Sequence, residues 1–242
     1  MKLHIYKNKE ELSGALASWM CEVIEKTLKE QEYFTLVLSG GSTPQSLYEV
    51  LASEAYKDKI NWNRVQVFWG DERAVPYADD RNNAKMAHEL LLSKVGIPSK
   101  NIHIIRTDIE PNFSRDAYRK MLHDYFDNTK TTFDLVLLGM GDDGHTLSLF
   151  PGSPIIEDDK YWVHSVYNEE QEMYRITLMP ALVNKAARIA FMVEGEKKAT
   201  VFQQVLQGEY NPLELPAQII KPVNGELHWF VDEAAAKELH SF

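Results

Sequence analysis

The feature that most constrains the fold of this sequence is the alternation of short, almost uninterrupted apolar runs with longer segments of helical periodicity. The apolar runs predicted to be strands are residues 34–38, 65–69, 102–105, 133–138, 188–193 and 227–231. Strands that are apolar on both faces are typical of a parallel sheet covered on both sides by helices. The pattern therefore predicts a three-layer α/β sandwich with a mostly parallel sheet, formed by residues 1–242 as a single domain.

Helical periodicity fills most of the chain between these strands. Helices are expected over residues 11–29, 44–56, 83–94 and 196–207, and Ser114 is the expected N-cap of one more. The first segment carries its large apolar side chains on one stripe, which suits a helix that covers one face of a sheet. The stripe consists of Leu12, Leu16, Trp19, Val23, Ile24 and Leu28.

Composition excludes several classes of protein. The chain has 242 residues and a formal net charge of −10, and it has no basic stripe, so we expect no nucleic-acid partner. No apolar stretch reaches the roughly 20 residues of a membrane span, and the N-terminal residues lack the apolar core of a signal peptide. The single cysteine, Cys21, cannot form an internal disulfide bond. We therefore expect a cytoplasmic protein with no membrane partner.

In parallel sheets ligands bind at the carboxyl ends of the strands, so the loops after Leu38, Trp69 and Leu138 are the places to look for chemistry. The first loop reads SGGSTP, residues 39–44. Its glycines allow close approach of the backbone, and Ser42 or Thr43 can cap the following helix. Free amides at such a helix start predict a phosphate site. The alternative is a capped strand-to-helix turn without a ligand.

The second loop places three charged residues directly after an apolar strand. In this loop Asp71 can orient a base or a sugar hydroxyl, and Arg73 can offer several donors to an anion. The polar stretch at residues 79–83 is expected to be a surface loop that also borders the site. The alternative for the charged triplet is a solvated turn with an internal ion pair.

The third loop, GMGDDGHTLSLFPG at residues 139–152, is the most informative. His145 is expected to work as a base near pH 7, and Asp142 or Asp143 can fix its tautomer. The three glycines also match the dinucleotide-binding pattern G-x-G-x-x-G. We do not favour that interpretation, because the match lies past the middle of the chain and Pro151 interrupts any following helix.

Two further basic positions are candidates for binding an anion. Arg175 begins the run RITL, and Lys197 and Lys198 stand at the start of a predicted helix. Cations at that end oppose the helix dipole, so a bound anion would explain one of the lysines. The alternative is that they are ordinary surface residues. The remaining histidines show no paired spacing typical of a metal site, so we expect no metal.

These motifs, in this order and spacing, resemble those of the 6-phosphogluconolactonases over nearly the whole chain. The resemblance rests on residues 39–44, 71–73, 139–152, 175–178 and 229–235. It implies a Rossmann-like fold shared with glucosamine-6-phosphate deaminases and ribose-5-phosphate isomerases. It also implies a metal-free esterase without a cofactor, which hydrolyses 6-phosphoglucono-δ-lactone in the oxidative pentose phosphate pathway.

The resemblance assigns roles to particular residues. It implies that His145 is the general base. Our mechanistic hypothesis adds that Arg73 or a loop amide stabilises the developing oxyanion and that Asp71 orients His145 or a sugar hydroxyl. The residues expected to hold the phosphate are Gly40, Gly41, Ser42, Thr43, Arg175 and Lys198. The match of Lys198 is the loosest, because Lys197 is adjacent. The expected partner is a small sugar phosphate lactone, and the expected assembly is a monomer or weak dimer.

Two other functions remain as alternatives. Glucosamine-6-phosphate deaminases have similar loops, but they carry a catalytic glutamate shortly after the Gly-His pair, where this chain has Leu149 and Phe150. A non-catalytic sugar-phosphate sensor is the other alternative, although such sensors normally carry a DNA-binding module, for which this chain has no room.

Overall fold

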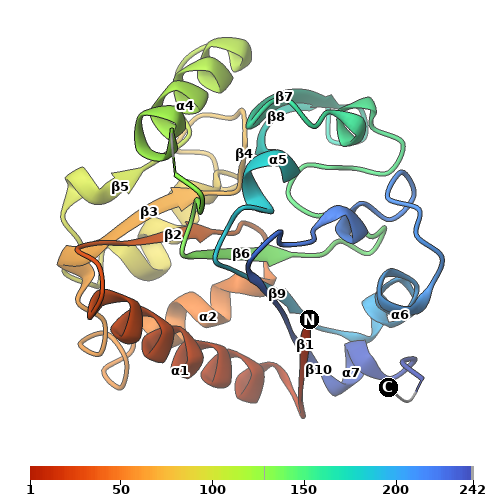
Figure 1. The fold of residues 1–242 in the computed structure, drawn as a ribbon, viewed down its shortest axis with the longest axis horizontal. Helices are drawn as coiled ribbons and strands as arrows, with labels where there is room; N and C mark the ends of the chain where they lie inside the picture. The colour runs from red at the N-terminus through yellow and green to blue at the C-terminus, as the bar shows by residue number, and fades with distance from the viewer. Residues whose placement is uncertain (128, 241–242) are drawn as a thin grey trace.

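The computed structural model describes residues 1–127 and 129–240. A seven-stranded sheet with the order β1-β10-β9-β6-β2-β3-β5 forms its centre (Figure 1). The strands of this sheet are β1 (Lys2–Tyr6), β2 (Phe34–Leu38), β3 (Val65–Trp69), β5 (Ile102–His103), β6 (Leu135–Gly139), β9 (Arg188–Val193) and β10 (Glu226–Asp232). Every neighbouring pair is parallel, so the predicted parallel α/β fold is confirmed.

A second sheet, which the sequence analysis did not predict, lies beside the central one. It has three antiparallel strands, β4 (Asp71–Arg73), β8 (Met173–Leu178) and β7 (Val163–Asn168). Only Gly70 separates β3 from β4, so the chain passes directly from one sheet into the other. The expected loop at residues 71–73 is therefore a strand. Its three polar residues give no apolar signal, and its partner lies about a hundred residues further along the chain.

The helices complete the layers. They are α1 (Lys9–Leu28), α2 (Thr43–Leu51), α3 (Asn83–Ala87), α4 (Pro111–Phe126), α5 (Pro180–Val183), α6 (Ala199–Gln207) and α7 (Glu233–Ala236). In Figure 1, α1 and α2 lie on one side of the central strands, and α4 and the second sheet lie on the other. The buried apolar side chains form a cluster that includes residues of both sheets, such as Phe191 and Ile176.

Several predicted boundaries are wrong. Helix α4 begins at Pro111 with Glu110 as its N-cap, and Ser114 lies inside the first turn, where its hydroxyl donates to the carbonyl of Arg106. Proline suits the first helical position because its missing N–H would have no partner there. The helix expected over residues 44–56 ends at Leu51. The helix expected over residues 83–94 is α3 followed by a wider π-helical turn, His88–Leu92.

Two buried tyrosines fix the carboxyl ends of neighbouring strands. The hydroxyl of Tyr48 donates to the carbonyl of Ser39 (2.6 Å) and accepts from its amide (3.0 Å). The hydroxyl of Tyr118 does the same for Trp69, at 2.9 and 3.0 Å. Each phenol satisfies a backbone N–H and C=O at the point where the chain leaves the sheet. The loops that follow β2 and β3 therefore start from fixed positions.

We expect Tyr118→Phe to lower the free energy of unfolding by about 1–3 kcal/mol, because it leaves two buried backbone groups without partners. Urea denaturation followed by circular dichroism measures the change. Tyr161→Phe is the control, since this tyrosine is 48% exposed and is expected to leave stability unchanged. An equal effect of the two substitutions would contradict the proposed role of Tyr118.

Candidate functional site

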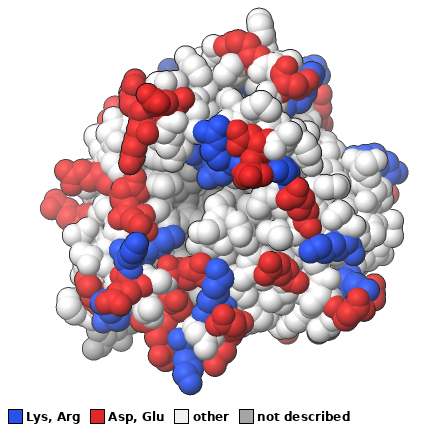
Figure 2. Space-filling view, turned by 180° about the vertical axis from the view of Figure 1, so that it is seen from behind, with Lys and Arg blue, Asp and Glu red and all other residues white. Residues whose placement is uncertain are grey.

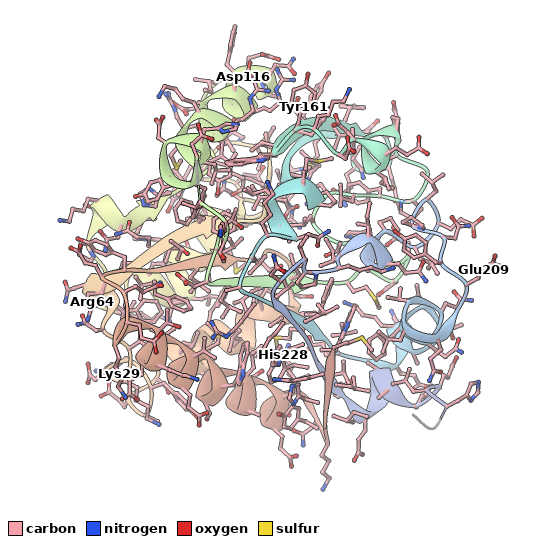
Figure 3. All side chains as sticks on the ribbon, viewed as in Figure 1. Lys29, Arg64, Asp116, Tyr161, Glu209 and His228 are labelled. Carbon is pink, nitrogen blue, oxygen red and sulfur yellow. The ribbon has the colours of Figure 1, made fainter. Side chains whose placement is uncertain are left out.

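All nine residues nominated from the sequence line one cavity of about 230 Å³ at the carboxyl ends of β2, β3 and β6. Six more residues complete its wall: Ser39, Gly139, Met140, Gly141, Leu147 and Gln171. The three loops therefore meet at one edge of the sheet, as the sequence analysis predicted. Many other charged side chains lie far from this cavity, and Figure 3 shows Lys29, Arg64, Asp116 and Glu209 at the periphery of the molecule.

The loop between β2 and α2 offers backbone and hydroxyl groups to the cavity. Gly41 has a φ of +91°, a conformation that favours glycine. Gly40 is also required, because a Cβ there would lie 2.1 Å from Oδ1 of Asn83. Helix α2 begins at Thr43, and Ser42 makes no capping hydrogen bond with its side chain. The expected cap is absent, so the helix start keeps polar groups that can bind an anion.

His145 is held by Asp143, which settles the choice that the sequence left open between two aspartates. Nδ1 of His145 lies 2.6 Å from Oδ1 of Asp143, and the same oxygen accepts the backbone N–H of His145 at 3.0 Å. The ring packs against Phe150, with 4.8 Å between the centroids, and touches Gly141, where a Cβ would lie 2.1 Å from Nδ1. The side chain is 30% exposed, so water can reach it.

This arrangement defines the electrostatics of the pair. Burial raises the pKa of Asp143, but the hydrogen bond and the charge of His145 outweigh it and hold the pKa below its usual range. An ionised carboxylate at Nδ1 favours the tautomer with its proton on that nitrogen. Nε2 of His145 is then the nitrogen that can accept a proton.

Asp71 contacts Arg175 rather than His145. Its Oδ2 accepts from the guanidinium of Arg175 and from the hydroxyl of Ser148, the latter at 2.7 Å. Burial raises the pKa of Asp71, but the guanidinium groups of Arg175 and Arg73 outweigh this and hold it below its usual range. Asp71 therefore orients a cation of the site, and Asp143 rather than Asp71 orients the histidine.

The alternation of side chains along β4 separates its three residues. Asp71 and Arg73 line the cavity, whereas Glu72 is fully buried and faces the start of α3. The oxygens of Glu72 accept the backbone amides of Arg73, Asn83 and Ala84, at 2.8, 2.7 and 2.9 Å. The solvated turn considered for this triplet is thus excluded.

The cavity gathers three cations. Besides Arg73 and Arg175, Lys198 enters it and donates to the carbonyl of Met140 at 2.5 Å. Burial lowers the pKa of Lys198, while Asp142 and Glu194 oppose the shift. Lys197 lines a different hollow, with Asp142 and Glu209 among its neighbours. The structure therefore places Lys198, and not Lys197, at the site.

Two residues at the site were missed or only partly anticipated. Gln171, in the turn between β7 and β8, lines the cavity and accepts from Nη1 of Arg175 at 2.8 Å. The polar residues around Gln171 in the sequence do not indicate that it belongs to the site. The stretch at residues 79–83 was expected to border the site, and Asn83 does so through a 2.7 Å hydrogen bond from Nη1 of Arg73.

Other possible sites carry less chemistry. Residues 140–153 contain no helix after β6, so the glycine pattern there lacks the helix start that a dinucleotide phosphate needs. A larger hollow of about 780 Å³ is lined by residues at the amino ends of the strands, among them Thr35, Gln66 and Arg188, and contains none of the nominated residues. Within the described ranges no three His, Cys, Asp or Glu side chains are grouped to hold a metal.

On the face that Figure 2 presents, basic side chains are scattered among acidic ones. The described helices include none that combines the length and apolar character needed to cross a bilayer.

The comparisons with known proteins identify what the chain is similar to. Residues 7–229 match the family described as glucosamine-6-phosphate isomerases/6-phosphogluconolactonase. A 6-phosphogluconolactonase of Haemophilus influenzae is 38% identical over 202 residues, which cover 84% of this chain and 86% of the relative. The solved 6-phosphogluconolactonase of Thermotoga maritima has a TM-score of 0.82 at 29% identity and covers 96% of this chain and 100% of its own. A monomeric glucosamine-6-phosphate deaminase, 20% identical with a TM-score of 0.82 over 98% of this chain and 99% of its own, shares the fold.

The buried Glu72 predicts a pH dependence of stability. Burial raises its pKa to about 7, against three opposing amide hydrogen bonds. The folded state therefore binds this proton more tightly than the unfolded chain, and stability is lost as the pH rises from about 4.5 to about 7. In Glu72→Gln the free energy of unfolding, measured by urea denaturation across this window, is expected to fall less steeply with pH.

Glu89→Gln is the matched control, because this side chain is 61% exposed and Glu89 lies in the π-helical turn that follows α3. It is expected to keep the slope of the wild-type protein. Parallel pH profiles for wild type and Glu72→Gln would show that Glu72 does not titrate in this range.

Proposed function

Because the chain belongs to the family of glucosamine-6-phosphate isomerases and 6-phosphogluconolactonases, we propose that it hydrolyses 6-phospho-D-glucono-1,5-lactone to 6-phospho-D-gluconate. The observation that carries the proposal is the pairing of His145 with Asp143 in the same cavity as three cations. A base and an anion site are what the hydrolysis of a phosphorylated ester requires. The relatives named 6-phosphogluconolactonase, similar over most of their length, support the same reaction.

We assign the phosphate of the substrate to the start of α2 and the cations beside it. Gly40, Gly41, Ser42, Thr43 and Lys198 line the cavity, and we assign the contacts with the phosphate to their amides, hydroxyls and ammonium group. Arg175 completes the anion site from β8, held in place by Asp71 and Gln171. Binding at this distant group fixes the lactone ring and reduces the entropic cost of the attack.

His145 acts on water in this proposal. Nε2 removes a proton from a water molecule, whose oxygen attacks the carbonyl carbon C1. The charge that forms on the carbonyl oxygen is stabilised by Arg73. The bond between C1 and the ring oxygen then breaks, and the imidazolium of His145 returns its proton to that oxygen as the ring opens. The products are the carboxylic acid, which ionises, and a hydroxyl group on C5.

The deaminase alternative lacks a group that its chemistry uses. The loop after His145 continues with Thr146, Leu147, Ser148, Leu149 and Phe150 and contains no carboxylate. Lactone hydrolysis needs one base, one water and a polarised carbonyl, and the cavity supplies the base and the polarising cation.

We also propose that the enzyme works in the cytoplasm, because the buried, unpaired Cys21 suits a reducing compartment. The proposed assembly is a monomer or weak dimer.

We expect His145→Ala to lower kcat by about 10²–10⁴-fold, the usual contribution of a general base. The measurement is a coupled assay in which glucose-6-phosphate dehydrogenase generates the lactone and 6-phosphogluconate dehydrogenase reports the acid, with the spontaneous rate subtracted. His240→Ala, an exposed histidine, serves as the control. If His145→Ala keeps near-normal turnover, the base is another group. Ammonia release from glucosamine-6-phosphate would instead favour the deaminase.

The adjacent lysines provide a test of the phosphate site. Lys198→Ala is expected to raise KM for the phosphorylated lactone by about tenfold or more and to change the rate with unphosphorylated glucono-δ-lactone little, because it removes a charge-assisted contact. Lys197→Ala is expected to keep the wild-type KM. Equal effects of the two substitutions, or equal losses with both lactones, would argue against phosphate binding by Lys198.

A further inference from the structure

The two arginines of the cavity are held in different ways. Arg175 is bound to a carboxylate, Asp71, so much of its charge is neutralised within the protein. Arg73 is held by neutral oxygens, at 2.7 Å from Nη1 to Oδ1 of Asn83 and at 2.8 Å to the carbonyl of Arg81. The charges of Asp71 and Glu72 act on Arg73 through space, but among the described residues neither forms an ion pair with it. More of its positive charge is therefore left for a ligand than at Arg175, which is paired directly with Asp71. This difference makes Asn83 the residue of interest.

The side chain of Asn83 has a single orientation that suits its surroundings. Its Nδ2 donates to the carbonyl of Asp71 at 2.9 Å, and its Oδ1 accepts from Arg73. The side chain also packs against Gly40, where even a methyl group would collide with it. Asn83 is 1% exposed. One amide group thus links the phosphate loop, the backbone of β4 and the guanidinium of Arg73.

The backbone of Asn83 is fixed from outside its own helix. Glu72 accepts the amides of Asn83 and Ala84, the first two of α3, and Asn82 accepts that of Lys85 at 2.9 Å. The backbone N–H groups at the start of α3 therefore all have acceptors, and Glu72 links this end of the helix to β4. Any displacement of Asn83 would break several buried hydrogen bonds at once.

Nη2 is the nitrogen of Arg73 that is left for a bound molecule. Nη1 is engaged by its two neutral acceptors, and Nε is buried without a partner. The side chain lines the cavity that also contains His145. We infer that Asn83 is a positioning residue, which holds Arg73 facing the reacting carbonyl as a cation that is not paired with a carboxylate. An amide rather than a carboxylate is therefore required at position 83.

The test is a double-mutant cycle on kcat for the lactone, and it rests on the proposed function. Asn83→Ala frees one edge of Arg73, and Asn83→Asp keeps an acceptor of the same shape but adds a charge that pairs with Arg73. Each is expected to lower kcat by about 10- to 100-fold, with less effect on KM. In an Arg73→Ala background Asn83→Ala is expected to change kcat by less than about twofold, because the group that Asn83 positions is gone.

Asn101→Ala is the matched control. Asn101 is also 1% exposed, and its Nδ2 donates to the carbonyls of Asn63 and Val65 at the amino end of β3, away from Arg73. Its substitution is expected to leave kcat near the wild-type value even if the melting temperature falls. Binding of 6-phosphogluconate, measured by calorimetry in the same variants, gives a second readout. In the proposed binding mode its carboxylate takes the place of the reacting carbonyl, so Asn83→Ala is expected to weaken binding when Arg73 is present and to change it little in the Arg73→Ala background.

The outcomes separate the two ideas. If the wild-type protein hydrolyses the lactone but Asn83→Asp keeps the wild-type kcat, the inference is overturned and the proposed function stands. The same holds if the losses of kcat on removing Asn83 and Arg73 are simply additive. A wild-type protein that neither hydrolyses the lactone nor binds 6-phosphogluconate overturns both. If Asn83→Ala does not fold, the kcat of Asn83→Asp, compared with that of Asn101→Ala in the enzyme that retains Arg73, tests the inference.

Discussion

The buried ion pair between Asp71 and Arg175 is the interaction on which the site depends. The two side chains are 9% and 5% exposed, and they join β4, which continues from the central sheet, to β8 in the middle of the second sheet. Taking both charges out of water is costly unless further hydrogen bonds offset the loss. Ser148 donates such a bond to Asp71 and Gln171 accepts one from Arg175, although Nε of Arg175 is buried without a partner. The pair therefore holds the second sheet over the carboxyl ends of the parallel strands and encloses the cavity.

The backbone around the cavity is fixed before any ligand binds. Tyr48 and Tyr118 form hydrogen bonds with the backbone groups at the ends of β2 and β3, and Glu72 accepts backbone N–H groups at the start of α3. These three buried side chains each bind backbone groups of a segment that carries site residues. Pre-organised donors do not have to reorient during a reaction, and this is how a site stabilises charge that develops in a transition state.

Charge is distributed unevenly between the surface and the site. The chain has a formal net charge of −10, yet Arg73, Arg175 and Lys198 converge in one small cavity. The cavity carboxylates are already paired, Asp71 with Arg175 and the neighbouring Asp143 with His145. An acidic protein can thus present a positive cavity because burial strengthens the interactions of the few cations within it. Such a cavity suits a small anion and not a polyanion.

The sequence by itself determined the parallel sheet and the three loops that carry the site, because apolar runs of strand length report burial on both faces and parallel strands end at one edge. It also provided His145 and the candidate cations. Only the tertiary structure decided that Asp143 rather than Asp142 holds His145, that Lys198 rather than Lys197 enters the cavity, and that Asn83 and Gln171 hold the arginines. It alone showed the second sheet as well. These facts depend on which side chains meet across distant segments, and the local pattern of a three-residue polar strand or a single lysine contains no information about its partner.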